Sequence, residues 1–269
     1  MTPARAARCV ALLAVLAVLG LAACSTVAET GRRRIAWLPE SYMSELGAAA
    51  YDEATSAKYP VIQSGPDHAM VQRIGKRIAE ASRKDYAWEF RLLDAKDEVN
   101  AFCLPGGKVA VYTGLLKVTQ NEDALACVMG HEVAHAIAEH GNERITQGLI
   151  QNGVLSITDA ALQTWGKMSD SSRESTMEAL GLASQLGAIL PFSREHESEA
   201  DEIGLRYMIR AGYDPYEAPK LWERMAANSK DRPPEFLSTH PDPENRAARL
   251  EQLIPKLLAE EKGKRMVPR

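Results

Sequence analysis

The sequence lacks an excess of positive charge, internal repeats, and any long apolar run beyond its first residues. Lysine and arginine total 32 against 36 acidic residues, a net charge of −4, which argues against nucleic acid as a partner. The longest later apolar segment, Ala179–Phe192, is too short to span a bilayer, contains Gln185 and is expected to be a buried helix. About 245 residues follow the N-terminal apolar run, enough for one sizeable core.

The first residues are typical of an export signal. Arg5 and Arg8 precede the apolar stretch Val10–Leu21, and Leu21-Ala22-Ala23-Cys24 resembles the lipobox of bacterial lipoproteins. This resemblance implies removal of residues 1–23 and lipidation of Cys24; an ordinary signal peptide is the alternative. Because Ser25, rather than aspartate, follows the cysteine, we expect a lipid anchor at the periplasmic face of the outer membrane.

The rest of the chain divides into a tether with an N-terminal segment (24–60), a main domain (61–262) and a short tail (263–269). The triplet Arg32–Arg34 could touch anionic headgroups, but a solvated linker is expected. Beyond the leader, the remaining free cysteines would be Cys103 and Cys127. They could pair in an oxidising compartment, and two separate buried thiols are the alternative.

Apolar spacing predicts a mixed fold. Residues 71–82 carry apolar side chains at helical intervals. Alternating segments predict strands over 88–92, 100–104 and 108–112, with a turn at Pro105–Gly107. Beyond Gly114 the pattern is helical. The sequence therefore predicts an α+β domain that is mostly helical, with a small sheet packed on several helices.

A helix that begins near Asn121, a good capping residue, carries a metal-binding pattern. His131 and His135 are four residues apart and share one helical face, so both imidazoles can reach one ion. Glu132 projects beside them and can accept a proton from an attacking water. Burying such groups among apolar neighbours without a use costs a few kcal/mol, which favours a functional role. His140 lies half a turn from His131 and is expected to be structural or exposed.

A catalytic zinc needs a third protein ligand and an open position. Ser193–Gly204 is the best source, because Glu197 and Asp201 are four residues apart and share a helical face. One carboxylate could bind the metal while the other hydrogen-bonds a ligand histidine. Spacing alone does not exclude His196 or Glu199 as the ligand, and a charged, solvated helix face is the remaining alternative.

Four segments together resemble a known family. They are, in chain order, Asn100–Gly107, His131–His135, Ser193–Gly204 and Ser238–Pro241. This set is similar to the zinc metallopeptidases that include the CAAX prenyl protease and the heat-shock protease HtpX, especially the BepA-like periplasmic or lipid-anchored members. The resemblance implies a metallopeptidase domain with its small β-sheet beside the active-site helix. The sequence departs from these relatives in lacking the membrane helices of HtpX and the tetratricopeptide repeats of BepA.

By position, the resemblance implies one zinc ion per subunit, held by His131, His135 and Glu197. It makes Glu132 the general base. Asp201 falls where the family has a second acidic residue, which orients a ligand histidine and is sometimes assigned a proton-donor role.

The resemblance also suggests a substrate-binding strand and a regulatory residue. Asn100, Ala101, Phe102 and Cys103 fall on an edge strand to which an extended peptide can add through main-chain hydrogen bonds. A bridge between Cys103 and Cys127 would restrain this strand. His240 could occupy the open position of the zinc and keep the enzyme latent; the alternatives are that it lines the cleft or caps contacts of Asn245 and Arg246.

The expected function is therefore a zinc metalloendopeptidase that hydrolyses misfolded or stalled envelope polypeptides, especially outer-membrane proteins. The alternatives are a chaperone-like lipoprotein with a structural zinc, which binds clients without cutting them, and a different zinc hydrolase acting on cell-wall peptides.

Overall fold

The computed structural model describes residues 24–56, 58–151, 192–227, 235–240 and 246–266. The expected leader (1–23), the end of the tail (267–269) and all of the apolar segment Ala179–Phe192 except Phe192 lie outside the described residues. Within the described ranges, no helix combines the length and the apolar composition that a bilayer span requires.

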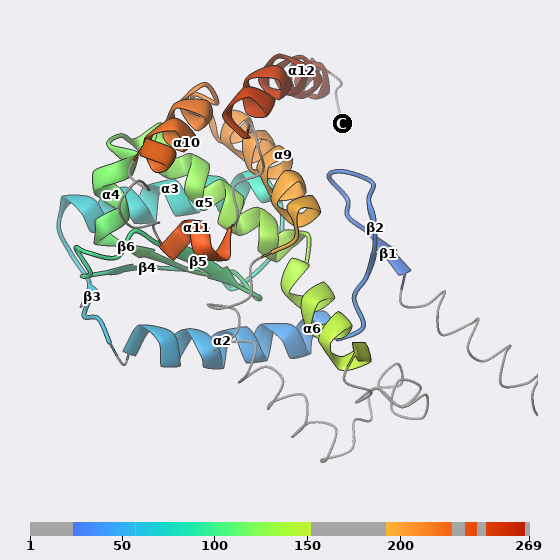
Figure 1. Cartoon of the computed structure of the whole chain (residues 1–269), viewed down its shortest axis with the longest axis horizontal. Coiled ribbons are helices and arrows are strands. Elements are labelled where there is room, and N and C mark those ends of the chain that lie inside the picture. Colours follow the sequence, from blue (N-terminus) through green and yellow to red (C-terminus); the bar gives the residue numbers. More distant parts are fainter. Residues whose placement is uncertain (1–23, 57, 152–191, 228–234, 241–245, 267–269) are drawn as a thin grey trace, which may run out of the picture.

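The described residues form a mostly helical structure with a small sheet, which confirms the α+β prediction (Figure 1). The helices are α2 (Glu40–Ser56), α3 (Pro66–Ser82), α4 (Thr113–Thr119), α5 (Glu122–Ile137), α6 (His140–Gln151), α9 (Arg194–Ala211), α10 (Glu217–Ala227), α11 (Glu235–Thr239) and α12 (Arg246–Met266). The strands are β1 (Cys24–Thr26), β2 (Arg33–Ile35), β3 (Val61–Ile62), β4 (Glu89–Leu93), β5 (Ala101–Leu104) and β6 (Lys108–Tyr112).

The main sheet has the strand order β3-β4-β6-β5, so β5 is an edge strand. β4 runs parallel to β6, and the other neighbouring pairs are antiparallel. Side chains alternate between the two faces of β6. Val109 and Val111 lie in the main core, together with residues of α3 and α5, and Ala110 packs on the opposite face against Tyr51 of α2. Helices therefore cover both faces of the sheet, as Figure 1 shows.

The three predicted strands correspond to β4, β5 and β6, and the predicted helix over 71–82 is the later part of α3. That helix begins earlier than its apolar pattern because Pro66, near its first position, suits a helix start. β1, β2 and β3 were not predicted. Each has only two or three residues, too few for an alternating pattern to be recognised.

Helix α5 is the central element of the main core. The side chain of Asn121 accepts a hydrogen bond from the Ala124 amide at 2.8 Å, so the predicted cap is present. Every residue from Ala124 to Ala136 is buried. Such a helix is enclosed by neighbours on all sides, and its histidines are therefore held away from bulk water.

Helices α5 and α9 pack closely because glycines face each other where they meet. A Cβ atom built on Gly204 of α9 would lie 2.9 Å from the His131 amide nitrogen. On the α5 side, a Cβ on Gly130 would lie 3.1 Å from the Gly204 carbonyl oxygen. The absence of both side chains lets the two backbones approach at the level of His131.

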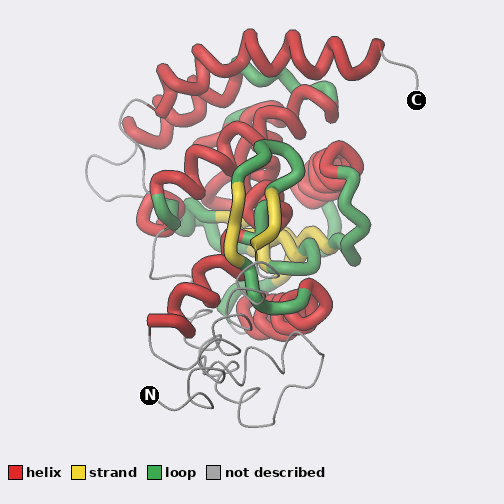
Figure 2. Tube along the Cα trace, turned by 90° about the vertical axis from the view of Figure 1, so that its right-hand side faces the viewer, coloured by secondary structure: helices red, strands yellow, loops and turns green. Residues whose placement is uncertain are grey.

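The segment expected to be a solvated linker is instead folded onto the domain, so that prediction is wrong. β1 and β2 pair antiparallel, with Cys24 opposite Ile35; we call residues 24–35 the N-terminal hairpin. Figure 2 shows it lying along the helices. Within the arginine triplet only Arg33 is exposed. Arg32 pairs with Glu143 and Glu199, and Arg34 pairs with Glu139, partners more than 100 residues away that local sequence does not indicate.

The Gly204→Ala substitution tests this close approach. The added methyl group would meet the α5 backbone, so we expect the free energy of unfolding to fall by about 1–3 kcal/mol. Urea denaturation of the metal-free protein measures it.

Gly263→Ala is the matched control, because Gly263 is exposed in α12 and its Cβ would meet nothing within 4 Å. Alanine there should stabilise the helix by about 0.5–1 kcal/mol. Equal stability of Gly204→Ala and the parent would contradict the packing argument.

Candidate metal centre

Two histidines from α5 converge on one point. His131 and His135 are buried, and their Nε2 atoms lie 3.1 Å apart. Two nitrogens bound to one tetrahedral zinc, each about 2.0–2.1 Å from the ion, lie roughly 3.3 Å apart. The helical spacing therefore produces the separation that a shared ion requires.

Helix α9 supplies a carboxylate to the same point. Ser193 caps this helix by accepting a hydrogen bond from the His196 amide at 3.1 Å. The Glu197 carboxylate lies 3.3 Å from the Nε2 atoms of both His131 and His135, through its two different oxygens. The other candidates, His196 and Glu199, lie in a neighbouring cluster. The side chains of His196, Glu197 and Glu199 are all buried, so the alternative of a charged, solvated helix face is wrong.

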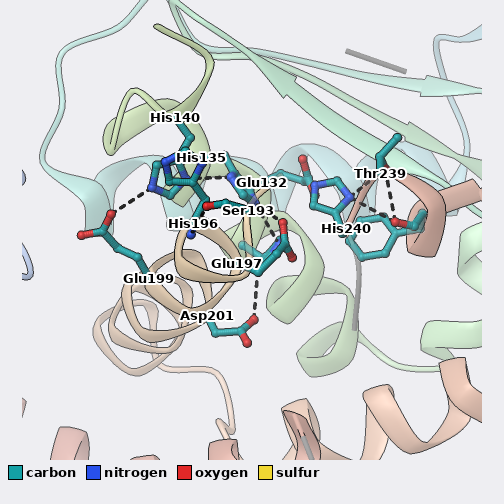
Figure 3. Close-up of polar contacts among 12 residues, drawn as sticks. Glu132, His135, His140, Ser193, His196, Glu197, Glu199, Asp201, Thr239 and His240 are labelled. Atoms are coloured by element: carbon teal, nitrogen blue, oxygen red, sulfur yellow. Dashed lines mark hydrogen bonds and ion pairs between the residues drawn. The ribbon is translucent and has the colours of Figure 1, made fainter. Parts of the chain in front are cut away.

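A third histidine approaches from the end of α11. Nδ1 of His240 lies 3.2 Å from the Phe236 carbonyl oxygen and 2.9 Å from Oγ1 of Thr239. A proton on Nδ1 donated to this carbonyl leaves Nε2 as an acceptor, facing Oε1 of Glu132 at 3.4 Å. One ligand atom each from His131, His135, Glu197 and His240 lies within 4.8 Å of all the others. Figure 3 shows His135, Glu197 and His240 of this group.

The donor set fits a zinc ion. Zinc in proteins is bound by imidazole nitrogens and carboxylate oxygens in tetrahedral geometry. Among the described residues, Oε1 of Glu132, Oε1 of Glu197 and Nε2 of His240 are buried without any hydrogen-bond partner. Buried polar atoms are rarely left unpaired, and a cation between them would satisfy the two that belong to the ligand group.

The charge of the centre also favours a cation. Burial opposes ionisation of Glu197, but the neighbouring His131 and His135 outweigh it and hold the pKa of this carboxyl well below its usual range. Burial likewise lowers the pKa of His131, but Glu197 and Asp201 outweigh it and raise this pKa to about 9, so a metal ion at this centre takes the place of a proton on the imidazole. An ionised carboxylate is thus held against two imidazoles in a dry site, where attraction to a divalent ion is strong.

Glu132 connects the metal centre to the edge strand. Burial raises the pKa of this carboxyl to about 8, and the Cys103 backbone of β5, which lies against it, lowers the pKa in part. The Tyr112 amide at the end of β6 donates a hydrogen bond to the carbonyl of Asn100, directly before β5. In an antiparallel pair, opposite residues alternate between hydrogen-bonded and non-hydrogen-bonded pairs. The main-chain groups of Ala101 and Cys103 therefore face the free edge. Cys103 and Cys127 are both free thiols.

Asp201 lies behind His131 rather than at the centre itself. Its Oδ1 is 3.1 Å from Nδ1 of His131, and it also pairs with Arg246 and Arg249 of α12. A carboxylate in this position fixes the orientation of the imidazole.

Sequence reasoning missed the role of Arg246. This side chain is buried, reaches Glu197 at 3.3 Å and stacks on Trp222 with its guanidinium carbon 3.4 Å from the ring centroid. Its position in the sequence offered a signal. Arg246 lies four and eight residues before the buried Leu250 and Ile254, so it occupies the apolar face of α12.

His140 was expected to be structural or exposed, and it is fully buried. It begins α6, directly after Glu139, which has a positive φ of 55°. Its Nδ1 lies 2.8 Å from Nδ1 of His135, and its Nε2 lies 2.9 Å from Oε2 of Glu199. His140 thus contacts His135, a candidate metal ligand, on the ring nitrogen that faces away from the other ligands.

Residues 66–254 match the model of peptidase family M48. The chain is 37% identical over 194 residues to "Mitochondrial metalloendopeptidase OMA1" of Schizosaccharomyces pombe, covering 71% of this chain and 54% of that protein. It is 35% identical over 213 residues to the protein of the same name from Arabidopsis thaliana (77% and 41%). It is 32% identical over 189 residues to "Beta-barrel assembly-enhancing protease" of Shigella flexneri (66% and 37%).

The chain thus spans about half, or less, of the length of these relatives. The matched region covers well over half of the chain and contains all four candidate ligands, and its fold places them around one point. The protein belongs to peptidase family M48, a family of zinc-dependent metallopeptidases.

Proposed function

We propose that this protein is a zinc-dependent metalloendopeptidase with one zinc ion per subunit. The observation that carries the proposal is the burial of Glu132 beside the convergent ligand atoms of His131, His135 and Glu197. Three protein ligands, an adjacent carboxylate and a displaceable fourth position form the arrangement that metal-assisted hydrolysis requires.

Each residue has a distinct part in peptide hydrolysis. A zinc ion held by His131, His135 and Glu197 would supply Lewis acidity, which would polarise the scissile carbonyl and lower the pKa of the attacking water towards neutral. Glu132 accepts a proton from the attacking water and later returns it to the leaving amine. Asp201 orients His131, with which it lies in contact, and is a positioning residue rather than a proton donor, because Arg246 and Arg249 already occupy its oxygens.

The substrate would bind as an extended polypeptide along β5. The edge-facing main-chain groups of Ala101 and Cys103 would pair with it, with Phe102 between them and Asn100 directly before the strand. Because the Cys103 backbone lies against Glu132, an added strand would lie beside the general base. Main-chain pairing implies loose side-chain specificity.

The substrates we propose are misfolded or stalled envelope proteins, particularly outer-membrane proteins. Support comes from the leader and the lipobox-like Cys24, which would anchor the protein by a lipid at the periplasmic face of the outer membrane. It also comes from relatives named beta-barrel assembly-enhancing proteases. Other relatives carry mitochondrial names, so digestion of unfolded outer-membrane protein by the purified enzyme is the deciding assay.

His240 would keep the enzyme latent by taking the fourth position on the zinc. Its Nε2 faces the centre, because Nδ1 is held by Phe236 and Thr239. The same closed arrangement is what a non-cleaving, chaperone-like protein with a structural zinc would have. Substitution of Glu132 and His240 separates the two functions.

Glu132→Gln should lower casein hydrolysis by roughly 10²–10⁴-fold, because the amide cannot accept the proton. Zinc content, measured by atomic absorption, should remain that of the parent. Glu195→Gln on the exposed start of α9 is the matched control and should keep full activity. Hydrolysis by Glu132→Gln at the parental rate would exclude this residue as the base.

His240→Ala should raise casein hydrolysis several-fold while zinc remains bound, because the remaining three ligands still hold the ion. Ser238→Ala, on the exposed side of α11, should leave the rate unchanged. If His240→Ala is no more active than the parent, then His240 does not impose latency. If the parent protein keeps its activity after zinc is removed with a chelator, the proposal of zinc-dependent peptide hydrolysis is refuted.

A further inference from the structure

A continuous series of polar contacts joins the N-terminal hairpin to the metal centre. Arg32 donates from Nε to Oε2 of Glu199 at 2.6 Å, and Thr30 donates to the other oxygen of Glu199. Glu199 in turn lies 2.9 Å from Nε2 of His140, whose Nδ1 lies 2.8 Å from Nδ1 of His135. Figure 3 shows the last three residues of this series in a row beside the centre.

Metal binding leaves one consistent placement of protons along these residues. Nε2 of His135 faces the other ligands, so a neutral His135 that binds through this atom carries its proton on Nδ1. That proton is donated to Nδ1 of His140, which must therefore be an acceptor. The proton of His140 then resides on Nε2 and is donated to the Glu199 carboxylate.

The two ligand histidines are thus supported in different ways. His131 contacts a carboxylate directly, through Asp201. His135 reaches its carboxylate, Glu199, only through the imidazole of His140. Metal-binding histidines usually donate their second N–H to a carboxylate, a carbonyl or water, which fixes the tautomer and the ring orientation. The interposed imidazole performs the same task over a longer distance.

Arg32 is placed to hold the far end of this series. Glu143 and Glu199 are both buried, and two buried carboxylates need a cationic partner. The Arg32 guanidinium bonds to both: Nη1 reaches Oε2 of Glu143 at 2.9 Å, Nη2 reaches its other oxygen, and Nε reaches Glu199. The hairpin therefore neutralises Glu199, which contacts His140, together with the neighbouring Glu143.

A second cation is the competing explanation for this cluster, since His140, Glu143 and His196 also lie within ligand distance of one another. However, both oxygens of Glu143 already accept hydrogen bonds from Arg32, and both nitrogens of His140 are engaged. The contacts therefore favour the Arg32 guanidinium, rather than a metal ion, as the cation at this position.

We propose that His140 and Glu199 are positioning residues that fix the tautomer and orientation of His135, and that Arg32 of the N-terminal hairpin holds Glu199 in place for this task. The proposal rests on the metal ligands of the proposed function. It predicts that a substitution in the hairpin, outside the region matched to the family, changes zinc affinity.

The first test compares variants of His140 in the full chain, with zinc affinity measured by competition with a chromophoric chelator. His140→Leu removes both hydrogen bonds and should weaken zinc binding by about 10–100-fold. His140→Gln offers one acceptor and one donor and should recover part of this loss. His196→Leu removes a buried imidazole stacked on His140 at 4.3 Å and should change affinity little.

The second test compares two arginines of the hairpin. Arg32→Gln should weaken zinc binding and alter the visible spectrum of the cobalt-substituted protein, because Glu199 loses its anchor. Arg34→Gln removes a similar ion pair, to Glu139, but leaves Glu199 untouched and should bind zinc as the parent does. Thermal unfolding of the metal-free variants measures any general loss of stability.

The outcomes separate the proposal from the function on which it rests. A parent protein that binds no zinc would refute the metal centre itself. The proposed positioning role would be overturned if His140→Leu and Arg32→Gln both bind zinc with the affinity of the parent. It would also be overturned if Arg32→Gln and Arg34→Gln lose zinc affinity equally. Two zinc ions per parent chain and one in His140→Leu would replace it with the second cation site. If His140→Leu does not fold, the comparison of the two arginines decides.

Discussion

The whole site depends on the close approach of α5 and α9. Two histidines on one helix can hold an ion only weakly by themselves, and the carboxylate that completes the group comes from a helix more than 50 residues later in the chain. Gly130 and Gly204 let the two backbones meet at the level of His131. A larger side chain at this crossing would separate Glu197 from the imidazoles, and the centre would lose its third ligand before any ligand itself had changed.

Around this crossing, each ligand is held by a residue from a different part of the chain. Asp201 of α9 contacts His131, and Arg246 of α12 contacts Glu197 and Asp201. Within α11, Phe236 and Thr239 hold the ring of His240. His140 of α6 contacts His135. Buried charged groups are tolerated only when paired. The polar groups therefore form a network around the centre, and two atoms that lack hydrogen-bond partners, Oε1 of Glu197 and Nε2 of His240, belong to the ligand group.

The parts of the site that could be predicted from the sequence are those set by local geometry. Helical spacing alone places His131 and His135 on one face, and the Asn121 cap follows from short-range preference. The choice among Glu197, His196 and Glu199 depends on how α9 is rotated against α5, which spacing does not contain. The arginine triplet was misread for a similar reason, because its partners Glu139, Glu143 and Glu199 are distant in sequence. Arg246 was detectable in principle, as a charge on an apolar helix face.

The N-terminal hairpin gives the peptidase a different boundary from the one that family comparison draws. The matched region begins at residue 66, whereas Arg32 lies well before it. A fragment trimmed to the match would keep every candidate ligand and the whole main sheet apart from β3, yet Glu143 and Glu199 would lose the Arg32 guanidinium that lies between them. Mutual repulsion of these two carboxylates would loosen the junction of α6 with α9. The smallest unit able to maintain this centre therefore includes a stretch of chain that similarity alone would discard.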